Sequence, residues 1–232
     1  MPELDWRTPW GFDVTAIARL RTDGYDRLEP DRPDQDTASR WNQRAFFVGD
    51  SEAELRELYV DTYLGNSYLR LGKQQIVWGE ADGLKVLDLV NPQSFREFIL
   101  DEFEDSRIPL WSAKWEVPLG EVWNAQLLLI PDQTYHHVPE DGLFAPTSPE
   151  LVPSPPAGAQ IIVTEPEVPD NTFSDADAGA QLSAYLDGWD VTFNYLYHYY
   201  DAPVVSLERS PAETRIETDF RRTHTVGGTV SN

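Results

Sequence analysis

The chain has 232 residues, and its hydrophobic share of 41% is enough to form a core. A net charge of −22 disfavours binding to nucleic acid, whose phosphate backbone is also negative, and the absence of cysteine excludes disulfides and thiolate chemistry. No apolar run approaches the roughly 20 residues of a transmembrane helix, so helical spans are excluded as well.

The first predicted elements are β-strands. A weak alternating pattern covers residues 12–21, and stronger patterns cover 55–64 and 68–78 on either side of the turn Gly65-Asn66-Ser67. Alternation at every second position is the period of a strand whose two faces meet different surroundings. The sequence therefore predicts an antiparallel pair of strands in this region.

Residues 92–109 break the strand pattern. Ser94 is suited to cap a short helix, because its hydroxyl can accept a bond from a free backbone N–H. In that helix Phe95, Phe98 and Ile99 would share one face, while the rest of the segment is mostly charged. We therefore expect a short helix between two groups of strands.

The clearest predicted element is a β-hairpin over residues 110–130. Trp111, Ala113 and Trp115 alternate with polar residues up to a turn at 118–120, and the alternation resumes at Trp123. A second hairpin covers 179–199, with Asp187-Gly188 as the two-residue type I′ turn. A last stretch, 223–232, still alternates where the sequence stops, so we expect this chain to form part of a larger β-structure.

Residues 131–177 lie between the two hairpins and hold nine of the 18 prolines. Proline lacks the N–H that a strand ladder needs, so this region is predicted to be one long loop. Short turns alternate with this loop, which indicates a sheet with short connections at one end and long connections at the other.

Two architectures fit these alternating strands: a soluble β-sandwich or barrel, and an outer-membrane barrel whose apolar face meets lipid. Strands of about 9–11 residues and aromatic residues near strand ends favour the membrane. The polar character of the other strand face suits a wet interior. We therefore predict an all-β fold, an antiparallel up-and-down transmembrane β-barrel, with residues 1–232 forming part of a single domain.

A family resemblance points the same way. The segment LRLGKQQIVWGEADG, followed by VLDLVNPQSFRE, is similar to the pattern Gly-Arg-Gln-x-x-x-Trp-Gly-Glu and a later Asn-Pro. It resembles the domain-of-unknown-function 1302 family of Gram-negative outer-membrane β-barrels, over roughly residues 50–232. Lys73 stands where the family pattern has Arg, and Ala81 stands where it has Ser or Thr. The matching residues are Gly72, Gln74, Trp78, Gly79, Glu80, Asn91 and Pro92.

This resemblance implies a partial barrel in the outer membrane, with its C-terminal part missing, and it leads to a hypothesis about the pore. Residues 84–109 would fold into the lumen and set ion preference with their charges, although a solvated surface loop is an equal alternative. The expected constriction residues are Arg96, Asp101, Glu102 and Arg107. The expected pore-lining residues are Arg70, Gln74, Trp78, Glu80, Lys114, Glu116, Asn124 and Gln126.

No nucleophile, phosphate-loop or zinc-protease motif is present, so we expect neither an enzyme, nor a cofactor, nor a metal site. The sequence predicts an outer-membrane porin-like channel, or a passive transporter component, for small solutes. Expected partners are outer-membrane lipid, a small-molecule solute and envelope export or uptake proteins. The alternative function is a soluble β-rich module whose exposed aromatic residues bind glycans.

Overall fold

The computed structural model of the protein describes residues 1–30, 34–47, 51–78, 88–98, 103–139, 141–143, 145, 160–164, 168–209 and 213–232. Within this part of the chain, no helix is long and apolar enough to cross a membrane. The only helix among the described residues is the single turn α1 (Phe103–Ser106).

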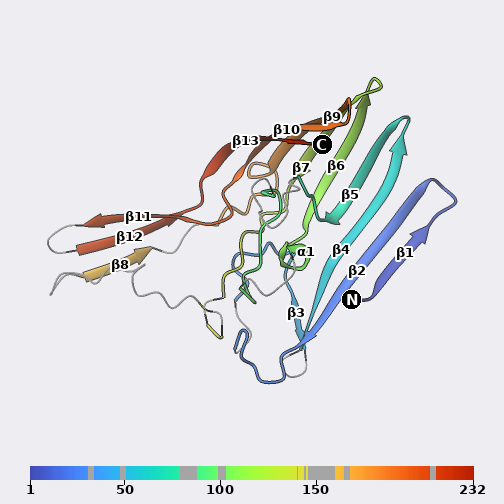
Figure 1. Ribbon diagram of the computed structural model, residues 1–232. Helices are drawn as coiled ribbons and strands as arrows, with labels where there is room; N and C mark the ends of the chain where they lie inside the picture. The colour runs from blue at the N-terminus through green and yellow to red at the C-terminus, as the bar shows by residue number, and fades with distance from the viewer. Residues whose placement is uncertain are drawn as a thin grey trace.

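Ten strands form one antiparallel sheet that curves around a group of inter-strand segments (Figure 1). Its order is β1-β2-β4-β5-β6-β7-β9-β10-β13, with β3 pairing to β4. The strands are β1 (Glu3–Arg7), β2 (Phe12–Thr22), β3 (Ala45–Phe47), β4 (Ser51–Leu64), β5 (Ser67–Gln74), β6 (Leu110–Leu119), β7 (Trp123–Ile130), β9 (Asp177–Leu186), β10 (Trp189–Tyr199) and β13 (Arg222–Ser231).

The all-β, antiparallel, up-and-down character predicted from the sequence is confirmed. β1 and β13 end the strand order and do not pair with each other, so the sheet is open and is not closed into a barrel. The predicted type I′ turn is also present, since Asp187 and Gly188 both have positive φ angles, of 49° and 93°. Turns of two to four residues at one end of the sheet contrast with the long segments at the other (Figure 1).

Three predicted elements differ from the structure. Strand β5 ends at Gln74 rather than at Trp78. The following residues leave the strand ladder, because the Ile76 N–H donates to the Asn91 side chain and Trp78 enters the buried apolar cluster. No helix begins at Ser94: its N–H donates to the Ser106 carbonyl, and Phe98 has a positive φ of 56° that no α-helix tolerates. The predicted long loop contains strand β8 (Gln160–Thr164).

Strand β8 belongs to a second, three-stranded sheet that the sequence reading missed. It pairs in parallel with β12 (Glu213–Asp219), which pairs antiparallel with β11 (Val204–Arg209). This small sheet projects away from the main one at the end with long connections (Figure 1).

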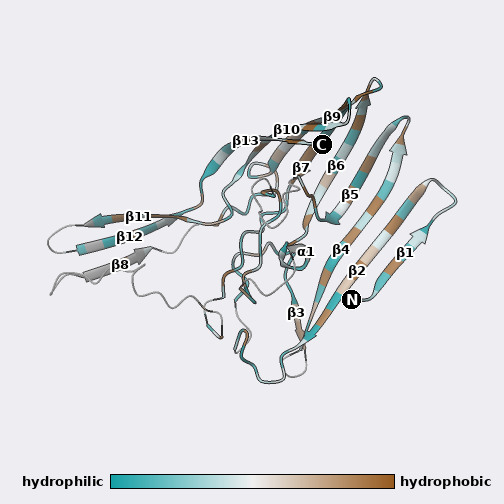
Figure 2. Cartoon of the chain, in the orientation of Figure 1, coloured by the Kyte–Doolittle hydropathy of each residue, from teal (hydrophilic) through white to brown (hydrophobic). Residues whose placement is uncertain are grey.

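The two faces of the main sheet differ in character. We call the face that contacts the inter-strand segments the inner face, and the opposite one the outer face. One row of paired residues on the outer face is Leu69, Trp115, Leu127, Ala180, Tyr195 and Val226. Figure 2 shows the resulting alternation of hydrophobic and hydrophilic residues along the strands.

Burial is inverted relative to an ordinary soluble domain. Among the described residues, buried polar and charged residues outnumber buried apolar ones by two to one, and many large apolar residues are exposed. Lys73 and Gln74 are among the most deeply buried side chains, with exposed fractions of 1% and 0%. In a soluble protein such charged and polar residues are rarely buried without specific partners.

Candidate functional site

The inner face carries an unbroken row of polar side chains across five strands, from β5 to β10. One row of paired residues brings Tyr68, Glu116 and Gln126 together with two residues further along the sheet. Those two, Gln181 and Asn194, are joined by a hydrogen bond of 3.0 Å from the Gln181 amide to the Asn194 carbonyl oxygen. The alternation predicted for these strands therefore places polar groups side by side on one surface.

Arg70 is the central cation of this surface. Its Nε and Nη2 donate to the two carboxylate oxygens of Asp61, at 2.6 and 2.9 Å, which is the bidentate geometry that favours arginine. The guanidinium also lies over the Tyr59 ring, 3.8 Å from its centroid. Tyr68 donates its hydroxyl to the same carboxylate at 2.6 Å. Arg70 is thus held in one orientation on the inner face.

A second polar chain runs from Lys114 to Trp78. The Lys114 ammonium lies 2.9 Å from Glu116, which accepts a hydrogen bond from the Gln126 amide at 3.3 Å. The Gln126 carbonyl oxygen in turn accepts a bond of 2.7 Å from Trp78 Nε1. Four of the residues predicted to line a pore are therefore connected directly.

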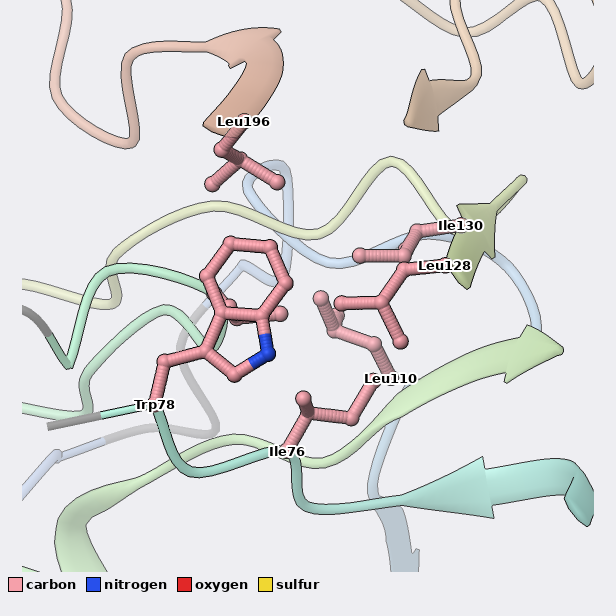
Figure 3. Packing of buried hydrophobic residues seen from close by; sticks show 7 residues of the cluster. Ile76, Trp78, Leu110, Leu128, Ile130 and Leu196 are labelled. Atoms are coloured by element: carbon pink, nitrogen blue, oxygen red, sulfur yellow. The ribbon is translucent and has the colours of Figure 1, made fainter. Parts of the chain in front are cut away.

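Trp78 was predicted to line a pore, but its ring lies in a buried apolar cluster. It packs with Ile76, Val90, Leu110, Leu128, Ile130 and Leu196 (Figure 3). Its ring also fits over Gly179, where an added Cβ would lie 2.6 Å from the Trp78 side chain. This cluster fastens the segment after β5 to the inner face of β7, β9 and β10.

Replacing Trp78 by phenylalanine is expected to lower the free energy of unfolding by about 1–3 kcal/mol, because Gln126 loses a buried donor. The matched control is Trp115→Phe, since Trp115 Nε1 donates to Ser67 but its ring is 40% exposed on the outer face. Urea unfolding in detergent should show a clearly smaller loss for the control. Equal losses would mean that the bond to Gln126 contributes little.

A buried ion-pair network ties the inter-strand segments to β4. Glu29 accepts from Arg44 at 2.7 Å, lies 2.5 Å from Arg96 Nε and contacts the His137 ring. Arg96 and Arg44 also pair with Glu52 of β4. The Glu29 side chain is 1% exposed, so this carboxylate joins three segments that are far apart in the sequence.

The surroundings of Glu29 lower its pKa. Burial alone would raise the pKa of this carboxyl, but hydrogen bonds from His137 and Arg44 outweigh burial and bring it to about 2. Glu29 is therefore ionised at neutral pH, and its negative charge balances the neighbouring guanidinium groups.

The remaining predicted residues have different positions. Arg107 is buried and pairs with Asp88 at 2.6 Å, and Gln74 is buried and donates to the Ser112 carbonyl. Asn124 is half-buried on the inner face opposite Ser183. Glu80, Asp101 and Glu102 lie outside the described residues.

Sequence reasoning missed a group of charged residues on β2 and β4. Arg19 pairs with Asp105 of α1 at 2.8 Å, and Arg56 pairs with Glu54 on the same strand at 3.3 Å. The available signal was the alternation of Arg19 and Arg21 around Leu20, which places two cations on one face of a strand. Asp105 and Glu97, the acidic partners of Arg19 and Arg21, come from distant segments and leave no local pattern.

Comparison with known proteins adds one match. A family model described as "Protein of unknown function (DUF1302)" matches residues 6–231, nearly the whole chain. No protein with curated annotation matches the sequence.

Proposed function

Since the chain belongs to the DUF1302 family of proteins of unknown function, we propose the role that its two sheet faces support best. It forms part of the wall of an outer-membrane β-barrel and acts as a porin-like channel, or a component of a passive transporter, for small solutes. The observation that carries this proposal is the apolar outer face.

The outer face is suited to lipid and poorly suited to water. Leu127, Phe193 and Val226 are 44%, 58% and 61% exposed. They lie on β7, β10 and β13, with β9 between the first two strands. Soluble monomers rarely expose a contiguous apolar surface of this extent. In a bilayer the same side chains would be buried in hydrocarbon, while every backbone group between strands stays paired.

Aromatic residues near both ends of the strands support the same role. Trp123 and Trp189 are exposed on the outer face near the short turns. Trp41 and Trp111 lie at the opposite end and are joined by a bond from Trp111 Nε1 to the Trp41 carbonyl. Two aromatic belts with aliphatic residues between them are typical of outer-membrane strands.

The inner face would line the water-filled side of the barrel. Its paired charges, such as Arg70 with Asp61 and Lys114 with Glu116, are compatible with a polar path for solutes. Segment 88–98 is packed against this face, where it would narrow the path. By analogy with known barrels, the short turns would be periplasmic and the long connections extracellular.

A glycan-binding module remains the second candidate, because exposed Trp and Tyr rings also stack on sugars. Glycan sites combine such rings with hydrogen-bonding side chains. On the outer face the neighbours of Trp115 are instead Leu69 and Leu127, which favours lipid as the contact.

The test is to extract the full-length protein from membranes in detergent and to record single-channel current in a planar bilayer. We expect discrete conductance steps. Neutralising an inner-face charge by Lys114→Gln is expected to shift the reversal potential towards cation preference. Arg215→Gln is the matched control, because Arg215 pairs with Glu213 on the projecting β12, outside the main sheet.

Two results would contradict the proposal. If the protein purifies without detergent and leaves the bilayer silent, the membrane role fails and glycan binding becomes the better hypothesis. If Lys114→Gln and Arg215→Gln change the reversal potential equally, the inner face does not line the conducting path.

A further inference from the structure

One small cavity lies where the wall strands β2 and β4 meet the inter-strand segments. Its volume is about 60 Å³, and five of its lining residues are arginines: Arg19, Arg21, Arg44, Arg56 and Arg96. A water molecule needs only about 10–15 Å³ of such volume. The cavity therefore has room for several waters or for a small anion.

The charge of this lining is opposite to that of the chain. Glu54 is the one carboxylate among the lining residues, whereas the whole chain has 40 acidic residues against 18 basic ones. The other lining side chains include neutral hydrogen-bonding groups, among them Asn42, Ser94 and Thr134. Glu54 and the carboxylates behind the lining balance the charge of the arginines, so the cavity offers a ligand a convergence of N–H and O–H donors.

Carboxylates that do not line the cavity hold several of these arginines in place. Asp105 binds Arg19, and Glu97 binds Arg21 at 3.1 Å. Glu29 and Glu52 each pair with both Arg44 and Arg96. A guanidinium has five N–H donors in a rigid fork, so a carboxylate on one edge leaves other edges to face a ligand. The fork also matches the geometry of oxyanions.

We infer that this cavity is a binding site for a small oxyanion, either the carboxylate head of an organic solute or a free inorganic oxyanion such as phosphate. The role of the site in transport rests on the proposed channel function. In that role the channel would carry anionic solutes, and their carboxylate or oxyanion group would bind between strands β2 and β4 and segment 94–96.

The experiment measures binding directly, on the full chain in detergent. Sodium acetate and sodium phosphate are each titrated at constant ionic strength against sodium chloride, and the thermal unfolding midpoint is followed. We expect the midpoint to rise with at least one oxyanion and not with chloride. A rise with acetate alone identifies carboxylate solutes, and a rise with phosphate alone identifies the inorganic anion. Absence of any rise beyond chloride would overturn the inference.

Variants connect the effect to the cavity. Arg21→Gln is chosen because its ion pair with Glu97 is partly exposed and its loss should be tolerated; it is expected to weaken anion binding about tenfold, the typical value of one charge-assisted hydrogen bond. Arg56→Lys keeps the charge but removes the fork and should also weaken binding. Arg215→Gln should bind like the wild type. Equal affinity in all four proteins would place the anion elsewhere.

The outcome also separates this inference from the proposed channel function. Anion binding without conductance would leave the site standing and reject the channel. Conductance without anion binding, and with the same reversal potential in Arg21→Gln as in the wild type, would support the channel and reject the anion site.

Discussion

Replacing Gly72 by alanine is expected to lower the free energy of unfolding by about 3 kcal/mol or more. Gly72 has a φ of +135°, a region that costs other residues about 1–3 kcal/mol. An added Cβ would also lie 2.2 Å from the Leu58 carbonyl oxygen and 2.7 Å from Tyr59 Cα. Both atoms are backbone, so β4 and β5 would have to move apart.

The matched control is Gly65→Ala in the turn between the same two strands. Gly65 also has a positive φ, of 65°, but no atom lies within 4 Å of its added Cβ. The control therefore isolates backbone strain, at about 1–2 kcal/mol. Urea unfolding in detergent, followed by tryptophan fluorescence, measures both variants. If they lose the same stability, the close approach of β4 to Gly72 is not what requires glycine.

The regular alternation of strand β5 ends directly after Gly72. The two residues that follow, Lys73 and Gln74, are both buried, so the regular alternation ends here. The Lys73 ammonium donates to the Leu55 carbonyl at 2.6 Å. A single backbone acceptor suits the point charge of lysine, where the family pattern has arginine. The resemblance based on this stretch is confirmed by the family match.

The alternation of apolar and polar residues predicted strands correctly wherever the two faces of a strand meet different surroundings. The hairpins β6–β7 and β9–β10 were predicted for that reason, and their registers place Lys114, Glu116 and Gln126 on one face as expected. The end of β5 could not be predicted, because residues 75–78 continue to alternate after leaving the sheet. The burial of Trp78 against Gly179 depends on a strand that is distant in the sequence.

The candidate site was predictable only in its wall residues. The bonds that hold the inter-strand segments join residues far apart, such as Glu29 with His137 and Arg19 with Asp105. Local spacing contains no information about such pairs. For the same reason a helix at Ser94 was wrong: Ser94 instead forms a β-bridge with His137, while neighbouring Gln93 pairs with Arg107.

Replacing Glu29 by glutamine is expected to cost about 3–5 kcal/mol of unfolding free energy at pH 7, because it leaves buried cations without their partner. Within the part of the chain that the structure describes, Glu52 would then be the one carboxylate that Arg44 and Arg96 share. The control Glu213→Gln removes an exposed ion pair with Arg215 and should cost less than about 1 kcal/mol. Equal losses in the two variants would show that the Glu29 network adds nothing beyond a surface pair.

The pH dependence gives an independent check on the same network. The pKa of Glu29 is lowered to about 2 in the folded protein, whereas an unfolded glutamate has a pKa of about 4.3. Its stabilising contribution is therefore complete above pH of about 4.3 and is lost as the pH falls through about 2. The stabilities of the wild type and Glu29→Gln should converge over this interval, as followed by urea unfolding at each pH. A difference that stays constant down to pH of about 2 would mean that the charge of Glu29 is not what joins segments 88–98 and 131–139 to β4.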